Sequence, residues 1–342
     1  MLDQPRIPSE WDRITTIESH TGGEPLRIIV DGFPELTGET ILERRRYMHD
    51  EYDTLRSALM WEPRGHADMY GAVLTEPVSD EADVGVLFTT NKGYSSMCGH
   101  GIIALGTALF ETGMLPPNQP EEIVAFDTPA GLVTATSQIE KDRVTSVSFE
   151  NVPSFAPLLD QTVTVPELGP VEFDLGYGGA FYAYCDADQI DLDLSPDNDD
   201  EIIHTGMAIK RAVSDSFDIK HPVEDDLSFL YGTVFRKESS TEGCDSKNVC
   251  VFADGQIDRS PTGTGVSGRL AIQHARGDLE VGDELVVESI IGTVFRGTIT
   301  GKEPYGGYDA IVPRISGSAY VTGRNEFVID PEDPLSDGFL IR

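Results

Sequence analysis

The chain carries the same local pattern twice, and this repetition constrains its fold more than any other feature. In FTTNKGYSSMCGHG (88–101), a phenylalanine at the end of a strand-like run precedes Cys98 by ten residues. In FADGQIDRSPTGTG (252–265), a phenylalanine precedes Thr262 by the same number of residues. A Gly-x-Gly and an apolar helical pattern follow in both places. The pattern therefore predicts two copies of a strand–glycine loop–helix unit.

A second pair of landmarks supports an internal duplication. GGEPLRIIVD (22–31) and GGAFYAYCDA (178–187) precede the two glycine loops by similar lengths of chain. Each helical pattern after a loop ends at a glycine, Gly113 or Gly277, as helix C-caps often do. Matched landmarks in the same order favour duplication over chance recurrence of glycine turns. We therefore expect two similar α/β halves that face each other across a cleft.

The remaining patterns predict an α+β or mixed α/β chain that is rich in strands. The clearest helical patterns cover 39–61, 102–113, 200–217 and 266–277. Alternating or β-branched runs predict strands at 14–19, 26–33, 72–78, 83–90, 132–139, 144–152, 180–186, 233–236, 249–253, 284–292, 293–300 and 311–316. We expect a first half of 1–153 plus about 320–342, and a second half of 154–319.

Length and composition exclude several classes of protein. The 342 residues, 39% of them hydrophobic, suffice for two cores. No apolar run is long enough for a membrane helix, and MLDQPRIPSEWDR (1–13) lacks a secretory pattern, so a cytoplasmic protein is expected. The four cysteines form no CxxC pair, which favours free thiols. No HExxH or Cys/His quartet is present, so no metal site is expected.

The charge is strongly acidic and spread along the chain. Asp and Glu number 59 against 25 Lys and Arg, for a formal net charge of -34. Phosphates would be repelled, which disfavours nucleic acid and anionic membranes as partners. A dispersed acidic surface with few lysines is typical of proteins from a high-salt cytoplasm, where salt screens self-repulsion. We therefore expect a halophile's protein; an ordinary acidic protein is the alternative.

The glycine loops are candidate anion sites. A helix N-terminus presents free backbone N–H groups with the positive end of the helix dipole behind them. Two such loops could hold a carboxylate from both sides. The helix start is also expected to lower the pKa of Cys98, making it a reactive thiolate. The alternative is a buried inert thiol, which is the prediction for Cys185 and Cys250; Cys244 receives no role.

His100 leaves three interpretations open. It could be a base for Cys98, a substrate ligand, or a surface residue of the loop. A Cys–His hydrolase usually takes its base from a distant part of the chain, so a covalent nucleophile is disfavoured. Neither loop fits GxGxxG in a βαβ unit or GxxxxGK[ST], which disfavours nucleotide binding.

Four stretches resemble the proline racemase family over nearly the whole chain. They are ESHTGGEPLRIIVDG (18–32), EPRGHADMYGAV (62–73), NKGYSSMCGHGIIALGTALFETG (91–113) and DRSPTGTGVSG (258–268). That family includes proline racemases, 4-hydroxyproline epimerases and trans-3-hydroxy-L-proline dehydratases. The resemblance implies a diaminopimelate epimerase-like fold, two pseudo-symmetric halves around a central cleft, with no cofactor and no metal. It also implies a small imino-acid substrate and allows a homodimer.

The resemblance implies a role for Cys98 and raises a question about Thr262. In the racemases, two cysteines face each other across the substrate's α-carbon; Cys98 matches the first, and Thr262 stands where the second is expected. A threonine hydroxyl has too high a pKa for balanced acid–base work. The Cys/Thr pair resembles the dehydratases. Cys98 would remove the α-proton of trans-3-hydroxy-L-proline, and water loss would give Δ1-pyrroline-2-carboxylate. The alternatives are a proline racemase or hydroxyproline 2-epimerase and a non-catalytic imino-acid binding protein.

The remaining site residues follow the family motif position by position. The resemblance implies that Gly99 and His100 contact substrate, that the N–H groups of Gly263 and Thr264 hold its carboxylate, that Asp258 binds the ring ammonium and that Phe252 packs on the ring. His20 and His66 are interpreted as structural, and His221 as a residue near the cleft.

Overall fold

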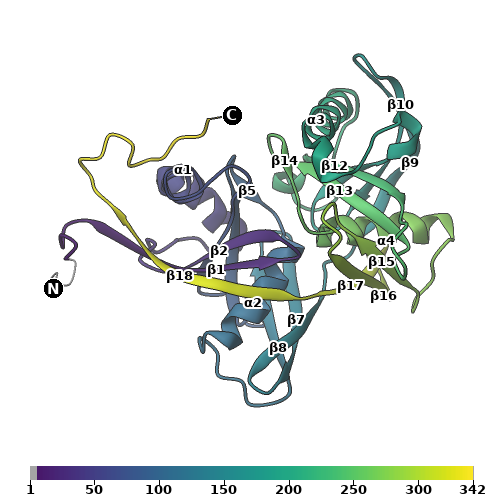
Figure 1. The fold of residues 1–342 in the computed structure, drawn as a ribbon. Helices are drawn as coiled ribbons and strands as arrows, with labels where there is room; N and C mark the ends of the chain where they lie inside the picture. The colour runs from purple at the N-terminus through teal and green to yellow at the C-terminus, as the bar shows by residue number, and fades with distance from the viewer. Residues whose placement is uncertain (1–5, 342) are drawn as a thin grey trace.

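The computed structural model describes residues 6–341, which form two α/β halves lying side by side (Figure 1). The first half, on the left in this view, holds the N-terminal part of the chain, and the last strand returns to it from the second half. Residues 1–5 and 342, which belong to the predicted first half and in part to the stretch examined for a secretory signal, lie outside the described residues.

The first half contains two helices and nine strands among the described residues. The helices are α1 (Ile41–Met60) and α2 (Gly99–Glu111). The strands are β1 (Asp12–Thr21), β2 (Glu24–Asp31), β3 (Tyr70–Thr75), β4 (Val84–Thr90), β5 (Tyr94–Ser95), β6 (Glu121–Thr128), β7 (Gly131–Glu140), β8 (Arg143–Glu150) and, from the end of the chain, β18 (Ala319–Ile329).

The second half repeats this inventory. The helices are α3 (Asp199–Ser216) and α4 (Gly263–Arg276), with short 3-10 turns η1 (Ala187–Ile190), η2 (Pro196–Asn198) and η3 (Asp225–Leu227). The strands are β9 (Phe155–Val165), β10 (Gly169–Tyr177), β11 (Phe181–Asp186), β12 (Leu230–Glu238), β13 (Ser246–Phe252), β14 (Gln256–Ile257), β15 (Glu284–Glu288), β16 (Val294–Tyr305) and β17 (Tyr308–Gly317).

The strands of the two halves pair in the same order, which confirms the predicted duplication. The first ladder runs β18-β1-β2-β3-β4-β6-β7-β8, with parallel pairs β2/β3 and β4/β6. The second runs β9-β10-β11-β12-β13-β15-β16-β17, with parallel pairs β11/β12 and β13/β15. Strand β18 thus occupies in the first half the place that β9 occupies in the second. An antiparallel pair, β8/β17, joins the two sheets.

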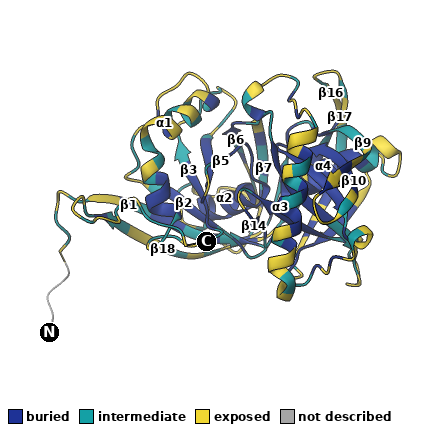
Figure 2. Ribbon diagram, turned by 90° about the horizontal axis from the view of Figure 1, so that it is seen from above, coloured by how far each residue is buried: buried dark blue, intermediate teal, exposed yellow. Residues whose placement is uncertain are grey.

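Helices α2 and α4 are the central helices of their halves. Helix α2 is buried from Gly99 to Phe110 and contacts β1, β2, β7, β8 and β18 (Figure 2). A helix that is apolar on all sides is stable only inside a core, and the IIALGTALF run meets this requirement. Helices α1 and α3 lie outside and keep one face exposed.

The four helices lie where the sequence predicts them, with starts and ends that differ by one to three residues. Helices α2 and α4 start three residues earlier than the sequence patterns indicate, so each Gly-x-Gly forms the first helical turn. Gly113 and Gly277 follow the helix ends with φ of 74° and 80°. The sequence patterns missed β5, β6, β9, β10, β14 and β18. Strand β18, AYVTGRNEFVI, has a polar centre, TGRNE, that interrupts the strand pattern, and it is extended because β1 supplies its hydrogen bonds.

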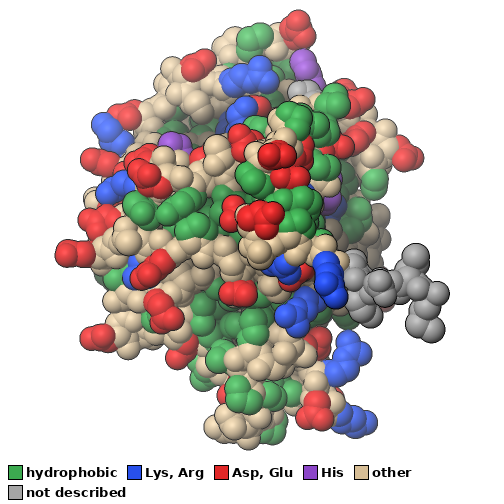
Figure 3. Space-filling model, turned by 90° about the vertical axis from the view of Figure 1, so that its left-hand side faces the viewer, with side chains coloured by type: hydrophobic (Ala, Val, Ile, Leu, Met, Phe, Trp, Pro, Cys, Tyr) green, Lys and Arg blue, Asp and Glu red, His purple; other side chains and the backbone are tan. Residues whose placement is uncertain are grey.

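Acidic side chains are spread over the surface. Figure 3 shows Asp and Glu scattered across the face it presents, with no single acidic block. This distribution agrees with the composition, and the high-salt origin stays a prediction. Within residues 6–341, no helix has the length and apolar character needed to cross a membrane. The numerical boundary between the halves also stays a prediction.

Candidate active site

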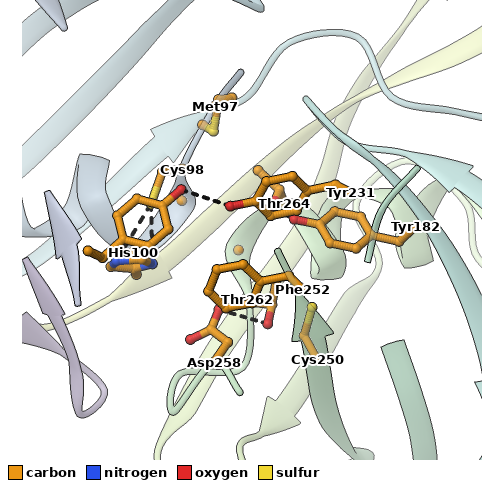
Figure 4. A pocket seen from close by; sticks show the side chains of 13 residues that line it. Met97, Cys98, His100, Tyr182, Tyr231, Cys250, Phe252, Asp258, Thr262 and Thr264 are labelled. Atoms are coloured by element: carbon orange, nitrogen blue, oxygen red, sulfur yellow. Dashed lines mark hydrogen bonds between the residues drawn. The ribbon is translucent and has the colours of Figure 1, made fainter. Parts of the chain in front are cut away.

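A cavity lies where the N-termini of α2 and α4 meet, between the two halves (Figure 4). The space in the cavity and at its opening to solvent that protein atoms do not fill is about 270 Å³. Every predicted site residue lines it: Cys98, Gly99, His100, Phe252, Asp258, Thr262, Gly263 and Thr264. The other lining residues are Tyr70, Met97, Tyr182, Tyr231 and Cys250. The Cys98 loop and the Thr262 loop, which are far apart in the sequence, therefore form one site.

The two central helices approach each other at a pair of glycines. A Cβ atom on Gly99 would lie 2.7 Å from the Cα of Gly263, and one on Gly263 would lie 2.9 Å from the Cα of Gly99. Real Cβ atoms do not approach backbone this closely, so only glycine fits at both positions. The glycines therefore bring two helix N-termini to one point.

This meeting of helix ends concentrates backbone donors at the cavity. The first turn of a helix has N–H groups without intrahelical acceptors. In α2 the Gly101 N–H donates to Cys98 Sγ (3.2 Å), whereas in α4 no side chain caps the helix. The N–H groups of Gly99, His100, Gly263 and Thr264 therefore face a site suited to an anion, favoured also by both helix dipoles.

Cys98 is the N-cap of α2, and its environment differs from the predicted one. The sequence predicts that the helix end lowers the thiol pKa. Instead, burial raises the pKa of Cys98 well above its usual value, and hydrogen bonds from the Gly101 N–H and the Tyr70 hydroxyl offset this only in part. The prediction was wrong because the closed cavity removes water from the thiolate more than the helix end stabilises it.

His100 lies against the Cys98 sulfur rather than on the surface. Its Nδ1 is 3.2 Å from Cys98 Sγ, and the side chain is buried. The Tyr70 ring packs edge-on against the imidazole, with ring centroids 4.7 Å apart. Burial and the nearby Arg259 guanidinium lower the pKa of His100 to about 3. The ring is therefore neutral and can accept a hydrogen bond from the thiol, so the surface interpretation is wrong.

Thr262 stands at the N-cap of α4 but does not cap it. Its hydroxyl donates to Asp258 Oδ2 at 2.9 Å, away from the helix N–H groups. The backbone of Thr262 has φ of 67°, a region that β-branched residues rarely adopt. Such strain tends to occur at functional sites, where the surrounding structure enforces it. At Thr262 the hydrogen bond to Asp258 helps to hold the backbone in this conformation.

Asp258 and its neighbours connect the two halves. Burial raises the pKa of Asp258, and donors from Ser260 and Thr262 counter that rise. The next residue, Arg259, pairs with the fully buried Glu24 of the first half (Nε to Oε2, 3.0 Å), and its backbone N–H donates to the same oxygen. The acidic loop of the second half is therefore anchored to the first half beside the cavity.

The sequence interpretation missed three tyrosines and a second thiol. Tyr70 and Tyr231 join hydroxyls across the cavity at 3.2 Å, and Tyr182 bonds Thr264 Oγ1 at 2.7 Å. The sequence favours an inert core thiol at Cys250, whereas the structure places it in the cavity wall beside Thr262. A signal for it existed: residues two apart on a strand share a face, and Cys250 precedes Phe252 by two on β13.

The other singled-out histidines and cysteines lie away from the cavity. His20 accepts from the Gly23 N–H, and His66 contacts the Ala67 carbonyl. His221 packs in an aromatic cluster against Tyr177, so the expectation that it approaches the cleft is not met. Cys185 is buried in β11 and Cys244 is partly exposed. Among residues 6–341, no group of His, Cys, Asp and Glu is arranged to hold a metal ion.

Known proteins resemble this chain along nearly its full length. A trans-3-hydroxy-L-proline dehydratase from Colwellia psychrerythraea is 45% identical over 340 residues, which cover 99% of this chain and 96% of that protein. A 3-hydroxyproline 2-epimerase from Burkholderia multivorans is 44% identical over 329 residues, covering 96% of this chain and 98% of that protein.

The fold and the family model agree with these relatives. The crystal structure of a hydroxyproline epimerase from Agrobacterium vitis, with bound trans-4-OH-L-proline, matches with a TM-score of 0.93 at 31% identity, covering 98% of this chain and 96% of that one. This likeness confirms the predicted mixed α/β fold of two halves. The family model described as proline racemase matches residues 16–340. The chain therefore belongs to the proline racemase family.

Proposed function

We propose that this protein is a hydro-lyase that converts trans-3-hydroxy-L-proline to Δ1-pyrroline-2-carboxylate without a cofactor. The observation that carries the proposal is the unequal pair of cap residues at the cavity. Cys98 offers a thiol, whereas the equivalent Thr262 offers a hydroxyl that is already bonded to Asp258. Elimination needs one base at the α-carbon, whereas two-base inversion needs a second group that can exchange protons at neutral pH.

The charged groups of the substrate complement the groups that line the cavity. Its carboxylate would bind at the N–H groups of Gly99, His100, Gly263 and Thr264, and its ring ammonium would pair with Asp258. Phe252 would pack against the ring. This binding mode leaves the α-carbon between Cys98 and Thr262, with the α-hydrogen toward the sulfur.

Removal of the α-proton develops negative charge on the carboxylate, and the helix N-termini are suited to stabilise it. Preorganised N–H donors contribute on the order of 3 kcal/mol each in oxyanion holes. The Cys98 thiolate takes the α-proton, C2=C3 forms, and the 3-hydroxyl leaves as water. The resulting enamine tautomerises to the Δ1-imine. His100, being neutral, orients the thiol by hydrogen bonding rather than acting as a strong base.

The test is a direct assay of product. The purified protein is incubated with trans-3-hydroxy-L-proline in high salt, and pyrroline formation is followed by NMR. We expect stoichiometric formation of water and Δ1-pyrroline-2-carboxylate. A correctly folded protein with a reactive Cys98 that forms none would contradict the proposal. Insensitivity to a chelator is expected as well, because no step uses a metal.

One observation favours a second candidate, an epimerase or racemase acting on proline or a hydroxyproline. Cys250 places a second thiol in the cavity wall on the Thr262 side, where burial and the nearby Asp258 carboxylate raise its pKa well above the usual value. A relative at 44% identity is a 3-hydroxyproline 2-epimerase. Incubation with L-proline in D2O discriminates the two. Loss of optical rotation together with α-deuteration, both abolished by Cys250→Ala, would favour the isomerase.

A further inference from the structure

We propose that the Tyr70–Tyr231 hydroxyl pair supplies the proton with which the substrate's 3-hydroxyl departs as water. This inference rests on the proposed function, since it assigns the acid for that elimination. Hydroxide is a poor leaving group because water is a weak acid with a pKa of about 15.7. A donor must therefore bond the oxygen while the C3–O bond breaks.

The stereochemistry of the substrate fixes the face on which this donor must lie. In the trans isomer the 3-hydroxyl and the carboxylate are on opposite faces of the ring. The α-hydrogen is also opposite the carboxylate, so the α-hydrogen and the 3-hydroxyl share one face. The base and the acid must therefore both act from the Cys98 side. Thr262 lies on the other side and is held by Asp258.

Tyr70 is on the required side. It comes from β3 of the first half, packs against the His100 ring that contacts Cys98, and its hydroxyl hydrogen-bonds the Cys98 thiol. The Tyr70 and Tyr231 hydroxyl oxygens are 3.2 Å apart, and Figure 4 shows Cys98 and Tyr231 apart from Thr262 and Asp258. Both rings are buried, so their hydroxyls lie in a part of the wall that has little contact with solvent. A hydroxyl at this place can orient a bound substrate by a hydrogen bond.

The neighbouring side chains hold the two tyrosines in place, and Ser95 also hydrogen-bonds their hydroxyls. Tyr231 stacks on Phe252 with ring centroids 5.4 Å apart and planes at 13°, which fixes its ring. One O–H proton bridges the two tyrosines, and the other, which can be shared with the Cys98 sulfur, can turn about its C–O bond toward a bound substrate. Since Tyr231 belongs to β12 of the second half, the pair forms only when the two halves are together.

The proton balance closes without another reactant. Cys98 takes the α-proton, and the C2–H electrons form C2=C3 while the C3–O electrons leave with oxygen. Tyr70 gives its proton to that oxygen, which departs as water. The Cys98 S–H then returns a proton to the Tyr70 phenolate, restoring thiolate and phenol. Burial keeps both tyrosines protonated at working pH.

The experiment compares two leaving groups in four proteins: wild type, Tyr70→Phe, Tyr231→Phe and Tyr177→Phe. Tyr177 is the matched control, because its buried hydroxyl lies outside the cavity and has no partner among the described residues. Water loss is measured with trans-3-hydroxy-L-proline, and fluoride release with trans-3-fluoro-L-proline. Fluoride departs without full protonation, so it reports proton abstraction by Cys98 without the acid.

We expect Tyr70→Phe to slow water loss about 100-fold, within the range for a general acid, while fluoride release stays within about threefold of wild type. Tyr231→Phe should have the same pattern with a smaller effect, and Tyr177→Phe should change neither rate. Water loss within threefold of wild type in Tyr70→Phe would overturn the inference. An equal fall with both substrates would also overturn it, since it indicates a packing role. A wild-type protein that releases neither water nor fluoride would overturn the proposed function itself.

Discussion

The Cys98 loop and the Thr262 loop occupy equivalent places in two halves with the same strand order, yet their cap side chains bond differently. Cys98 turns toward its own helix and accepts the Gly101 N–H. Thr262 turns away from its helix and donates to Asp258. Their backbones differ as well, with φ of -142° at Cys98 and 67° at Thr262. A duplicated scaffold therefore carries an asymmetric site.

This difference shows which features of the site both halves share through the duplication and which depend on a single residue in one half. Both loops contribute a glycine at the helix contact and N–H groups for an anion. Only the first loop offers a thiol at the cap, in contact with a neutral imidazole. We infer that the two halves share anion binding, whereas proton transfer at the α-carbon belongs to the first half.

The largest test of this comparison removes the thiol. Cys98→Ser keeps a side chain that can cap α2, so folding should persist, but its hydroxyl cannot serve as the base. We expect pyrroline formation to fall about 10³-fold, in line with the contribution of a general base. The control is Cys185→Ala, a buried thiol outside the cavity, which should retain activity. Comparable losses in both variants would refute a special role for Cys98.

The next test pushes apart the N-termini of α2 and α4, which meet at the two glycine loops. In Gly99→Ala the added Cβ would lie 2.7 Å from the Gly263 Cα, so the helices must move apart. Misplacement by a fraction of an ångström to 1 Å can cost about 100-fold in rate, which we expect in kcat/KM. Gly323→Ala, where no atom lies within 4 Å of the added Cβ, is the matched control. Full activity in Gly99→Ala would show that the contact is unimportant.

The pH dependence tests which side chain of the first loop titrates. Burial raises the pKa of Cys98, so the thiol is protonated below that raised pKa and the reactive thiolate grows as pH rises. We expect kcat/KM to increase about tenfold per unit through neutral pH. Because His100 has a pKa of about 3, it should give no break near the usual histidine range. A profile that instead levels off above neutral pH would place the base at a group with an ordinary pKa.

The smallest expected effect comes from making the second loop like the first. Thr262→Cys replaces the hydroxyl bond to Asp258 with a weaker thiol bond, worth about 1 kcal/mol, so dehydration should slow roughly fivefold. A thiol on the opposite face should also allow some inversion at the α-carbon, seen as α-deuterated product of opposite rotation in D2O. Complete absence of inversion would mean that position 262 does not reach the α-carbon.

Local sequence patterns predicted the parts of the fold that depend on local chemistry. The four helices, the two glycine loops and the apolar run that buries α2 follow from periodicity and from glycine placement. The patterns miss strand β18, whose centre is polar, because its extended form depends on pairing with β1 from the other end of the chain. Such long-range pairing leaves little trace in a short window of sequence.

The residues of the candidate site also fall into two groups, those that local motifs predict and those that they do not. Cys98, Thr262 and Asp258 were identified from motifs, since they lie in two short stretches that resemble a known family. Tyr70, Tyr231 and Cys250 were not, because each belongs to a strand whose pattern is that of an ordinary core. Their importance comes from which wall of the cavity their strands form.

The sequence by itself determined the duplication, the family resemblance and the inequality of Cys98 and Thr262, because these depend on residue types at fixed spacing. Only the tertiary structure decided the environment of Cys98 and Thr262, and with it the pKa of the Cys98 thiol. Closure of the two halves removes water, which raises the pKa of Cys98 where the helix end alone would lower it. The same closure joins Tyr70 to Tyr231 across the halves, since no local pattern encodes a contact between strands more than a hundred residues apart.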